Sequence, residues 1–175
     1  AFEAISRDYK FNNFKAFGHS NGGLIWTYWL EHYYLTYSDE ITMKRLMTVG
    51  TPYNFSEKNI NHKTQMLEDF IKCKNRLPKS LVVYSVSGGK NYESDGIVPE
   101  ASVAAGKYIF QKQVKSYTAM TITGDKADHS DLPQNQQVVQ VIQQYLLELI
   151  KNKNNQVISR QGKKSDNDKN GQNEQ

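Results

Sequence analysis

The feature of this sequence that most limits its fold is an alternation of short apolar runs with helical patterns through residues 1–150. Four runs are strand-like, and a glycine follows each within two residues: 14–17, 43–49, 80–86 and 117–123. Three other segments have the apolar spacing of helices: 24–37, 63–74 and 138–150. Strands that alternate with helices predict βαβ units, so we expect an α/β fold with a mostly parallel sheet and flanking helices.

The most distinctive residues of the chain follow the predicted strands. Gly-His-Ser-Asn-Gly follows the first strand, Ser-Asp-Gly-Ile-Val-Pro the third and Asp-His-Ser the fourth. In parallel α/β sheets, sites lie outside the carboxyl ends of the strands. We therefore expect Ser20, Asp95 and His129 to lie together at one edge of the sheet.

The first of these motifs matches the G-x-S-x-G nucleophile elbow, in which a serine projects from a strained strand-to-helix turn. We expect Gly18 and Gly22 to be glycines because a side chain at either position would collide with the neighbouring strand and helix. The helix that starts near Asn21 places its positive end near Ser20, and the Asn21 backbone N–H is expected to bind an oxyanion. His19 is expected to pack or hydrogen-bond beside the serine.

The order Ser20, Asp95, His129 is the chain order of a triad in this architecture. His129 would take the serine proton and return it to the leaving group, while Asp95 would orient the imidazole and stabilise its cation. The alternatives are an ordinary N-cap serine, a surface-loop histidine and a turn aspartate. Asp125 and Asp128 are rival acids, but they are close to His129 in sequence and better interpreted as turn or capping residues.

With these motifs the sequence resembles an α/β-hydrolase, and more narrowly a Gram-positive family of predicted cell-surface hydrolases formerly classed as a domain of unknown function. GHSNGG corresponds to the family's GHSMGG, and GTPYN to its GTPFN; SDGIVP and HSDLPQN also correspond to family segments. The resemblance covers roughly residues 10–150 and implies the triad Ser20, Asp95 and His129. Asn21 replaces a more usual methionine, which leaves the backbone donor unaffected.

We expect a serine hydrolase, carboxylesterase-like or lipase-like, that cleaves a small-molecule ester, thioester or amide through an acyl-enzyme. The alternative is a non-catalytic surface or binding protein with a hydrolase fold. The reaction needs no cofactor. No metal site is predicted, because His19, His32 and His62 show no ligand spacing with one another or with Cys73, the single cysteine. The family resemblance implies an extracellular or cell-surface location, with a cytoplasmic one as the alternative.

Nineteen residues precede Ser20, too few for the early strands of an α/β-hydrolase and for the loop that gives the second oxyanion donor. We therefore expect residues 1–150 to be the C-terminal portion of a hydrolase domain, inactive without its other part. A missing N-terminal segment would also allow membrane association. Segment 54–79 is expected to form a small cap over the site, with a plain crossover helix as the alternative.

The last segment, 151–175, is polar and is expected to be disordered. Its six basic and three acidic residues account for most of the net charge of +4. Acids interrupt the basic run and no aromatic residues interleave it, so binding to nucleic acid is not expected.

Overall fold

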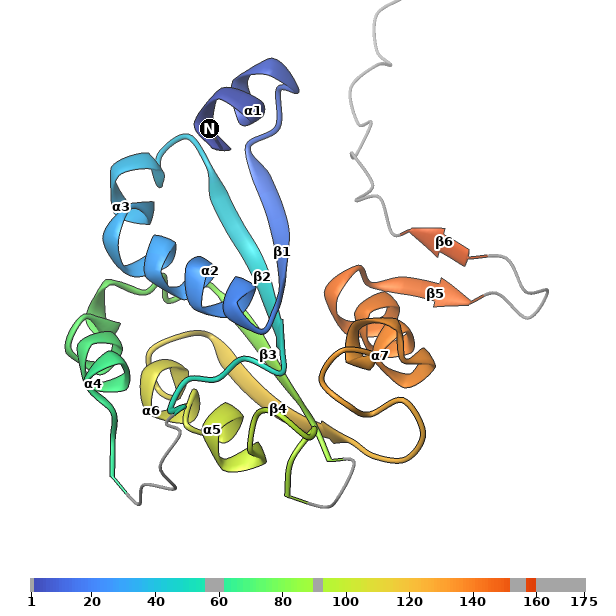
Figure 1. Ribbon diagram of the computed structural model, residues 1–175. Coiled ribbons are helices and arrows are strands. Elements are labelled where there is room, and N and C mark those ends of the chain that lie inside the picture. Colours follow the sequence, from blue (N-terminus) through green and yellow to red (C-terminus); the bar gives the residue numbers. More distant parts are fainter. Residues whose placement is uncertain (1, 56–61, 90–92, 152–156, 160–175) are drawn as a thin grey trace, which may run out of the picture.

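The computed structural model describes residues 2–55, 62–89, 93–151 and 157–159 (Figure 1). Its centre is a parallel sheet with the strand order β1-β2-β3-β4. These strands are β1 (Asn13–His19), β2 (Thr42–Val49), β3 (Val82–Gly88) and β4 (Ser116–Ile122). The predicted α/β class and parallel sheet are confirmed, and all four carboxyl ends lie at the same edge of the sheet.

Helices cover both faces of the sheet (Figure 1). On one face lie α2 (Asn21–His32), α3 (Tyr34–Tyr37), α4 (Gln65–Lys72), the 3-10 turn η1 (Lys74–Arg76), α5 (Glu100–Ala104) and α6 (Lys107–Phe110). On the other lie α7 (Gln136–Val141) and its π-helical continuation η3 (Ile142–Leu146). The short helix α1 (Phe2–Asp8) precedes β1, and the 3-10 turn η2 (Leu132–Gln134) precedes α7.

Two apolar clusters hold these layers together. The first joins the sheet to α2, α4 and α6 and includes Leu30, Leu46, Leu67 and Phe110. The second joins the opposite face to α7 and η3 and includes Met47, Val86, Val138 and Leu146. Because β2 contributes to both clusters, it is buried on both faces, as expected for an inner strand of a parallel sheet.

An irregularity in β2 explains which side chains reach which cluster. Phe14 pairs with Met43 but Lys15 pairs with Arg45, so Lys44 is an extra residue in the ladder. This bulge shifts the alternation of the strand by one residue. Met43 and Leu46 therefore lie in the same cluster although they are three residues apart.

One carboxyl group is buried beside the first cluster. Glu31, on α2, is only 2% exposed, and neither of its carboxylate oxygens has a hydrogen-bond partner among the described residues. Burial raises the pKa of this carboxyl to about 8, an effect that the nearby Arg76 guanidinium partly opposes. Such a group is rare in protein cores, where buried polar atoms are normally paired.

The C-terminal helix is shorter than its apolar stripe predicts. The helical segment ends at Leu146, and the stripe residues Leu149 and Ile150 belong instead to β5 (Leu149–Lys151). The cause is Glu148, whose backbone is in the left-handed region with φ 54° and cannot continue a right-handed helix. Its carboxylate is held by Arg45 at 2.6 Å and by Lys15 at 3.3 Å.

Two further expectations concern segments 151–175 and 54–79. β5 pairs antiparallel with β6 (Val157–Ser159), so these tail positions form a strand where disorder is predicted, and the rest of the tail lies outside the described residues. The described part of 54–79 contains α4, whose Leu67 and Phe70 pack in the first cluster. Such packing is what the crossover-helix alternative predicts, and the cap over 54–79 stays a prediction. Residues 56–61 lie outside the described residues.

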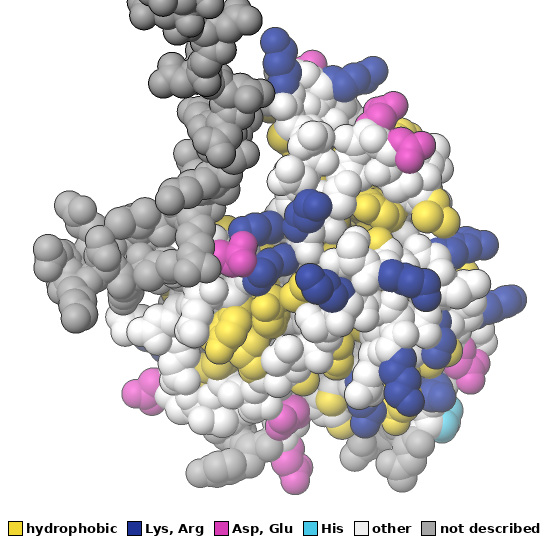
Figure 2. Space-filling view, turned by 180° about the vertical axis from the view of Figure 1, so that it is seen from behind, with side chains coloured by type: hydrophobic (Ala, Val, Ile, Leu, Met, Phe, Trp, Pro, Cys, Tyr) yellow, Lys and Arg dark blue, Asp and Glu magenta, His cyan; other side chains and the backbone are white. Residues whose placement is uncertain are grey.

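Exposed charge on the described residues is divided into several groups. Figure 2 shows the molecule from behind, with separate groups of Lys and Arg side chains around a hydrophobic patch. Within the described ranges, no helix has the length and apolar character needed to cross a membrane.

Candidate active site

Three of the sheet's strand ends bring Ser20, Asp95 and His129 into one hydrogen-bonded row. Ser20 Oγ lies 3.0 Å from His129 Nε2, and His129 Nδ1 lies 2.6 Å from Asp95 Oδ2. A carboxylate only accepts, so Nδ1 carries the hydrogen that it donates to Asp95, and Nε2 is free to accept the serine hydrogen. This is the arrangement of a nucleophile, a general base and the acid that orients the base.

Ser20 occupies the turn between β1 and α2 in a conformation that is unusual for a residue with a side chain. Its φ is 53° and its ψ is −122°, and its N–H donates to the Val49 carbonyl at 2.8 Å. It stands at the N-cap position of α2, but its hydroxyl makes no capping hydrogen bond to the helix. The N-cap alternative therefore does not explain the side chain, which is directed at His129 instead.

Of the two glycines in the elbow motif, only one has the role that the motif predicts. A Cβ on Gly18 would lie 2.6 Å from backbone atoms of Gly22 and Gly23, so the prediction for Gly18 is confirmed. A Cβ on Gly22 would have no neighbour within 4 Å, so the predicted collision at this position is wrong. The close approach is at Gly23, where a Cβ would lie 2.1 Å from Thr51 Oγ1.

Asn21 is the first residue of α2 and directly follows the nucleophile. The N–H groups in the first turn of a helix have no acceptor within the helix, and the helix dipole is positive there. The Asn21 N–H is thus in the position that the oxyanion prediction requires, and its role as a donor stays a prediction.

Asp95 is the buried anchor of the row, with only 1% of its surface exposed. Its Oδ1 accepts hydrogen bonds from the backbone N–H groups of Ile97 and Val98, at 3.0 and 2.7 Å. Its backbone carbonyl also accepts from the His129 N–H at 2.9 Å. These bonds fix the position of the carboxylate and of the loop that carries His129.

The rival acids have the local roles expected of them. Asp128 Oδ1 accepts from the Asp131 N–H at 3.2 Å, which makes it a turn residue. The backbone carbonyl of Asp125 accepts from the Asn135 side chain at 3.0 Å. Asp95 is therefore the aspartate whose carboxylate pairs with the imidazole of His129.

His19 contacts His129, whereas the sequence predicts that it packs or hydrogen-bonds beside the serine. Its Nε2 lies 2.8 Å from the His129 carbonyl oxygen, and the two ring centroids are 4.8 Å apart. Since a carbonyl oxygen only accepts, Nε2 of His19 carries the hydrogen. Burial lowers the pKa of His19, and the charge of the neighbouring His129 acts in the same direction, which favours a neutral ring.

Two further glycines, which the sequence indicates only as residues at strand ends, allow the ends of β2 and β3 to approach the triad. Gly50 has φ 60°, and a Cβ there would lie 3.3 Å from both Asp95 Oδ2 and His129 Nδ1. A Cβ on Gly88 would lie 2.5 Å from the Ala127 carbonyl oxygen and 2.8 Å from Asp95 Cβ. Their positions directly after β2 and at the end of β3 are the signal that could have identified them.

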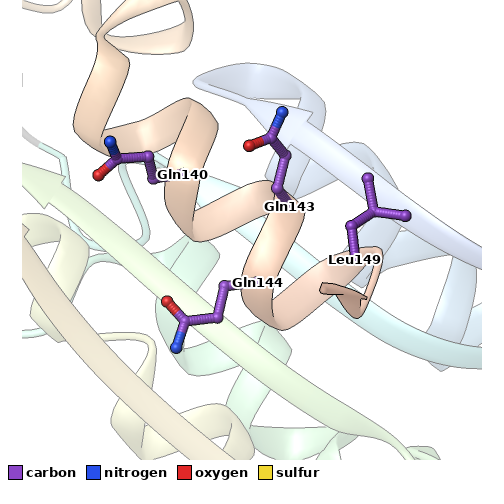
Figure 3. Close-up of a pocket in the computed structure, with 4 residues that line it drawn as sticks. All are labelled: Gln140, Gln143, Gln144 and Leu149. Atoms are coloured by element: carbon purple, nitrogen blue, oxygen red, sulfur yellow. The ribbon is translucent and has the colours of Figure 1, made fainter. Parts of the chain in front are cut away.

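A separate pocket of about 290 Å³ lies along α7, η3 and β5, on the face of the sheet opposite α2. Figure 3 shows its lining residues, Gln140, Gln143, Gln144 and Leu149. None of these four side chains is a nucleophile, an acid or a base, so the lining of this pocket offers no group for the chemistry predicted at the strand ends.

Comparison with known proteins gives two kinds of match. Residues 1–149 match a protein family described as "Alpha/beta hydrolase of unknown function (DUF915)". Among curated proteins, none matches the chain.

Two solved structures are similar to this one. The "putative cell surface hydrolase" from Lactobacillus plantarum WCFS1 is 52% identical, with a TM-score of 0.73 over 84% of this chain and 58% of that one. The product of the gene lin2722 from Listeria innocua is 27% identical, with a TM-score of 0.75 over 86% of this chain and 64% of that one. The chain thus spans about three fifths of the length of each.

Proposed function

Because the chain belongs to a family of alpha/beta hydrolases, we propose that it is a serine hydrolase that cleaves an ester, thioester or amide through an acyl-enzyme on Ser20. The observation that carries this proposal is the continuous row from Ser20 Oγ to His129 at 3.0 Å and from His129 to Asp95 at 2.6 Å. An ordinary N-cap serine and a surface-loop histidine would not be expected to form two successive hydrogen bonds that end at a buried carboxylate.

In the first half of the reaction, Ser20 Oγ attacks the carbonyl carbon while His129 Nε2 takes the serine proton. Asp95 stabilises the imidazolium through the Nδ1 hydrogen bond. The negative oxygen of the tetrahedral intermediate faces the N-terminus of α2, where we assign one donor to the Asn21 N–H. Collapse of the intermediate breaks the bond to the leaving group, which takes the proton from Nε2.

In the second half, water enters where the leaving group was. His129 Nε2 takes a proton from the water, whose oxygen attacks the acyl carbon on Ser20. The tetrahedral intermediate then releases the acid and returns the proton to Ser20 Oγ. Neutral His19 keeps a second positive charge away from the imidazolium, since its ring lies 4.8 Å from that of His129.

We favour a carboxylesterase-like or lipase-like reaction on a small-molecule acyl ester. We also propose a location at the cell surface, supported by the description of the Lactobacillus plantarum protein. Both proposals concern the whole protein, because the chain spans only about three fifths of the length of each similar structure.

Hydrolysis of nitrophenyl esters by the full-length protein tests the mechanism. We expect Ser20→Ala and His129→Ala each to lower kcat by on the order of 10⁴–10⁶-fold, with KM little changed. Ser38→Ala is the matched control, because the Ser38 hydroxyl only donates to the Leu35 carbonyl. Turnover in Ser20→Ala equal to that of the wild type would exclude the acyl-enzyme and favour a different hydrolytic site.

A further inference from the structure

Among the described residues, three metal-ligating side chains come together far from the triad. One ligand atom from each of Glu31, His32 and Cys73 lies within 4.8 Å of the others. Glu31 and His32 form the last turn of α2, and Cys73 joins α4 to η1. Since α2 begins at the nucleophile and has 12 residues, this cluster lies roughly 16 Å from Ser20 along the helix axis.

Glu31 is the member of this cluster that its surroundings leave unexplained. It lies on the core-facing stripe of α2 with Thr27 and Leu30, both of which are buried. In the part of the chain that the structure describes, its carboxylate oxygens have no hydrogen-bond partner, and Arg76 donates instead to the Glu31 backbone carbonyl, at 3.5 Å. A buried carboxylate that lacks partners is costly unless it is protonated, paired or bound to a cation.

The donor set indicates the class of cation. A thiolate, an imidazole and a carboxylate together suit Zn²⁺, whereas Mg²⁺ and Ca²⁺ prefer oxygen ligands alone. Ligand atoms around tetrahedral Zn²⁺ are about 3.5 Å apart, given metal–ligand distances of about 2.0–2.3 Å. His32 is exposed and Cys73 is half-buried, so both have room to rotate by the small amount required.

We propose that Glu31, His32 and Cys73 form a Zn²⁺ site with water as the fourth ligand, which ties the end of α2 to the junction of α4 and η1. The bound cation provides the partner that the buried Glu31 carboxylate lacks. Tyr28, whose ring centroid is 4.1 Å from that of His32, orients the imidazole from the preceding turn of α2. The expected effect of this site is on stability, and the site stands independently of the hydrolase proposal.

The test uses the full-length protein freed of metal with a chelator and then titrated with ZnCl₂ or CoCl₂. At 100 times the dissociation constant, Zn²⁺ is expected to raise Tm by roughly 5–10 °C. Co²⁺ is expected to give a thiolate-to-metal charge-transfer band in the near ultraviolet. Each variant is compared with and without metal, so its own basal stability does not affect the result.

Glu31→Gln and His32→Gln are expected to abolish most of the Zn²⁺-dependent rise in Tm, and Cys73→Ser to abolish both the rise and the Co²⁺ band. Glu68→Gln and His62→Gln are the matched controls, because both side chains are exposed and outside the cluster. Controls that keep the rise support the site. No rise in the wild type, an equal rise in Glu31→Gln and Cys73→Ser, or no thiolate band with Co²⁺ would each overturn it.

Discussion

At the scale of single residues, the geometry of the triad depends on glycines as well as on the three triad side chains. The backbone of the elbow, the end of β2 and the end of β3 all approach Ser20, Asp95 or His129 through glycines. Only some of these glycines are required by contact. Their substitutions therefore have different expected effects, which makes them sensitive tests of the structure.

Gly22 and Gly23 form the first matched pair. Alanine at Gly23 would push against the buried Thr51 side chain, and we expect it to lower the free energy of unfolding by about 1–3 kcal/mol. Alanine at Gly22 meets nothing within 4 Å and is expected to be neutral or stabilising by up to about 1 kcal/mol. Urea unfolding measures both. Equal losses in the two variants would contradict the contact with Thr51.

Gly50 and Gly124 form the second pair, because both have positive φ, of 60° and 92°. Alanine is strained at either position, so both variants are expected to lose stability. Only at Gly50 would the Cβ crowd the Asp95–His129 hydrogen bond, and there we expect kcat/KM to fall about 10–100-fold. Ester hydrolysis distinguishes the two. Full activity in Gly50→Ala would mean that the bond tolerates displacement.

His19 makes a prediction about pH. Burial lowers its pKa below the ordinary value of 6.5, so the unfolded chain binds a proton more readily than the folded one. Above about pH 6.5 the ring is neutral in both states and does not lower the free energy of unfolding. As the pH falls below that value, the unfolded chain takes up the proton first and the free energy of unfolding falls. We expect the unfolding free energy of His19→Gln to fall less steeply between pH 7 and 5 than that of the wild type. Parallel curves would exclude this contribution.

At the scale of elements, the segment between β4 and α7 determines where His129 stands. Asn135 secures this segment from both sides: its Oδ1 caps α7 by accepting from the Gln137 N–H at 2.8 Å, while its Nδ2 donates to the carbonyls of Asp125 and Lys126. It is only 3% exposed. One side chain therefore couples the start of α7 to the loop that carries the general base.

Asn135→Ala is expected to lower the free energy of unfolding by about 1–3 kcal/mol, because it removes the cap and the two hydrogen bonds to the carbonyls of Asp125 and Lys126. It should also lower kcat, since the loop with His129 is loosened. Asn135→Ser keeps a capping oxygen and is expected to lose less stability. A Ser variant as unstable as the Ala variant would show that the cap contributes nothing.

At the scale of the whole molecule, the sequence indicates the parallel sheet and the positions of Ser20, Asp95 and His129, because each follows a strand-like run and strand ends meet at one edge. It does not indicate that the glycine packed against Thr51 is Gly23 and not Gly22, since that depends on where Thr51 lies after β2. The bulge at Lys44 and the helix end at Glu148 depend on the backbone conformation of single residues, which the spacing of apolar residues does not predict.

The cluster of Glu31, His32 and Cys73 escapes a search for ligand spacing for a related reason. Cys73 is far from the other two in sequence, and they meet only because α2 packs against α4 and η1. One local signal is present, since Glu31 is a charged residue on the buried stripe of α2. A charged residue on a core-facing stripe is therefore worth examining as a candidate ligand even where no motif surrounds it.

The central claim is that Ser20 is the nucleophile of a hydrolase, and covalent labelling of the full-length protein tests it most directly. After reaction with a fluorophosphonate, intact mass and peptide mapping should show one adduct, on the peptide that contains Ser20. The adduct should disappear in Ser20→Ala, form much more slowly in His129→Ala and persist in Ser38→Ala. A folded wild-type protein that is not labelled, or an adduct on another serine that survives in Ser20→Ala, would contradict the claim.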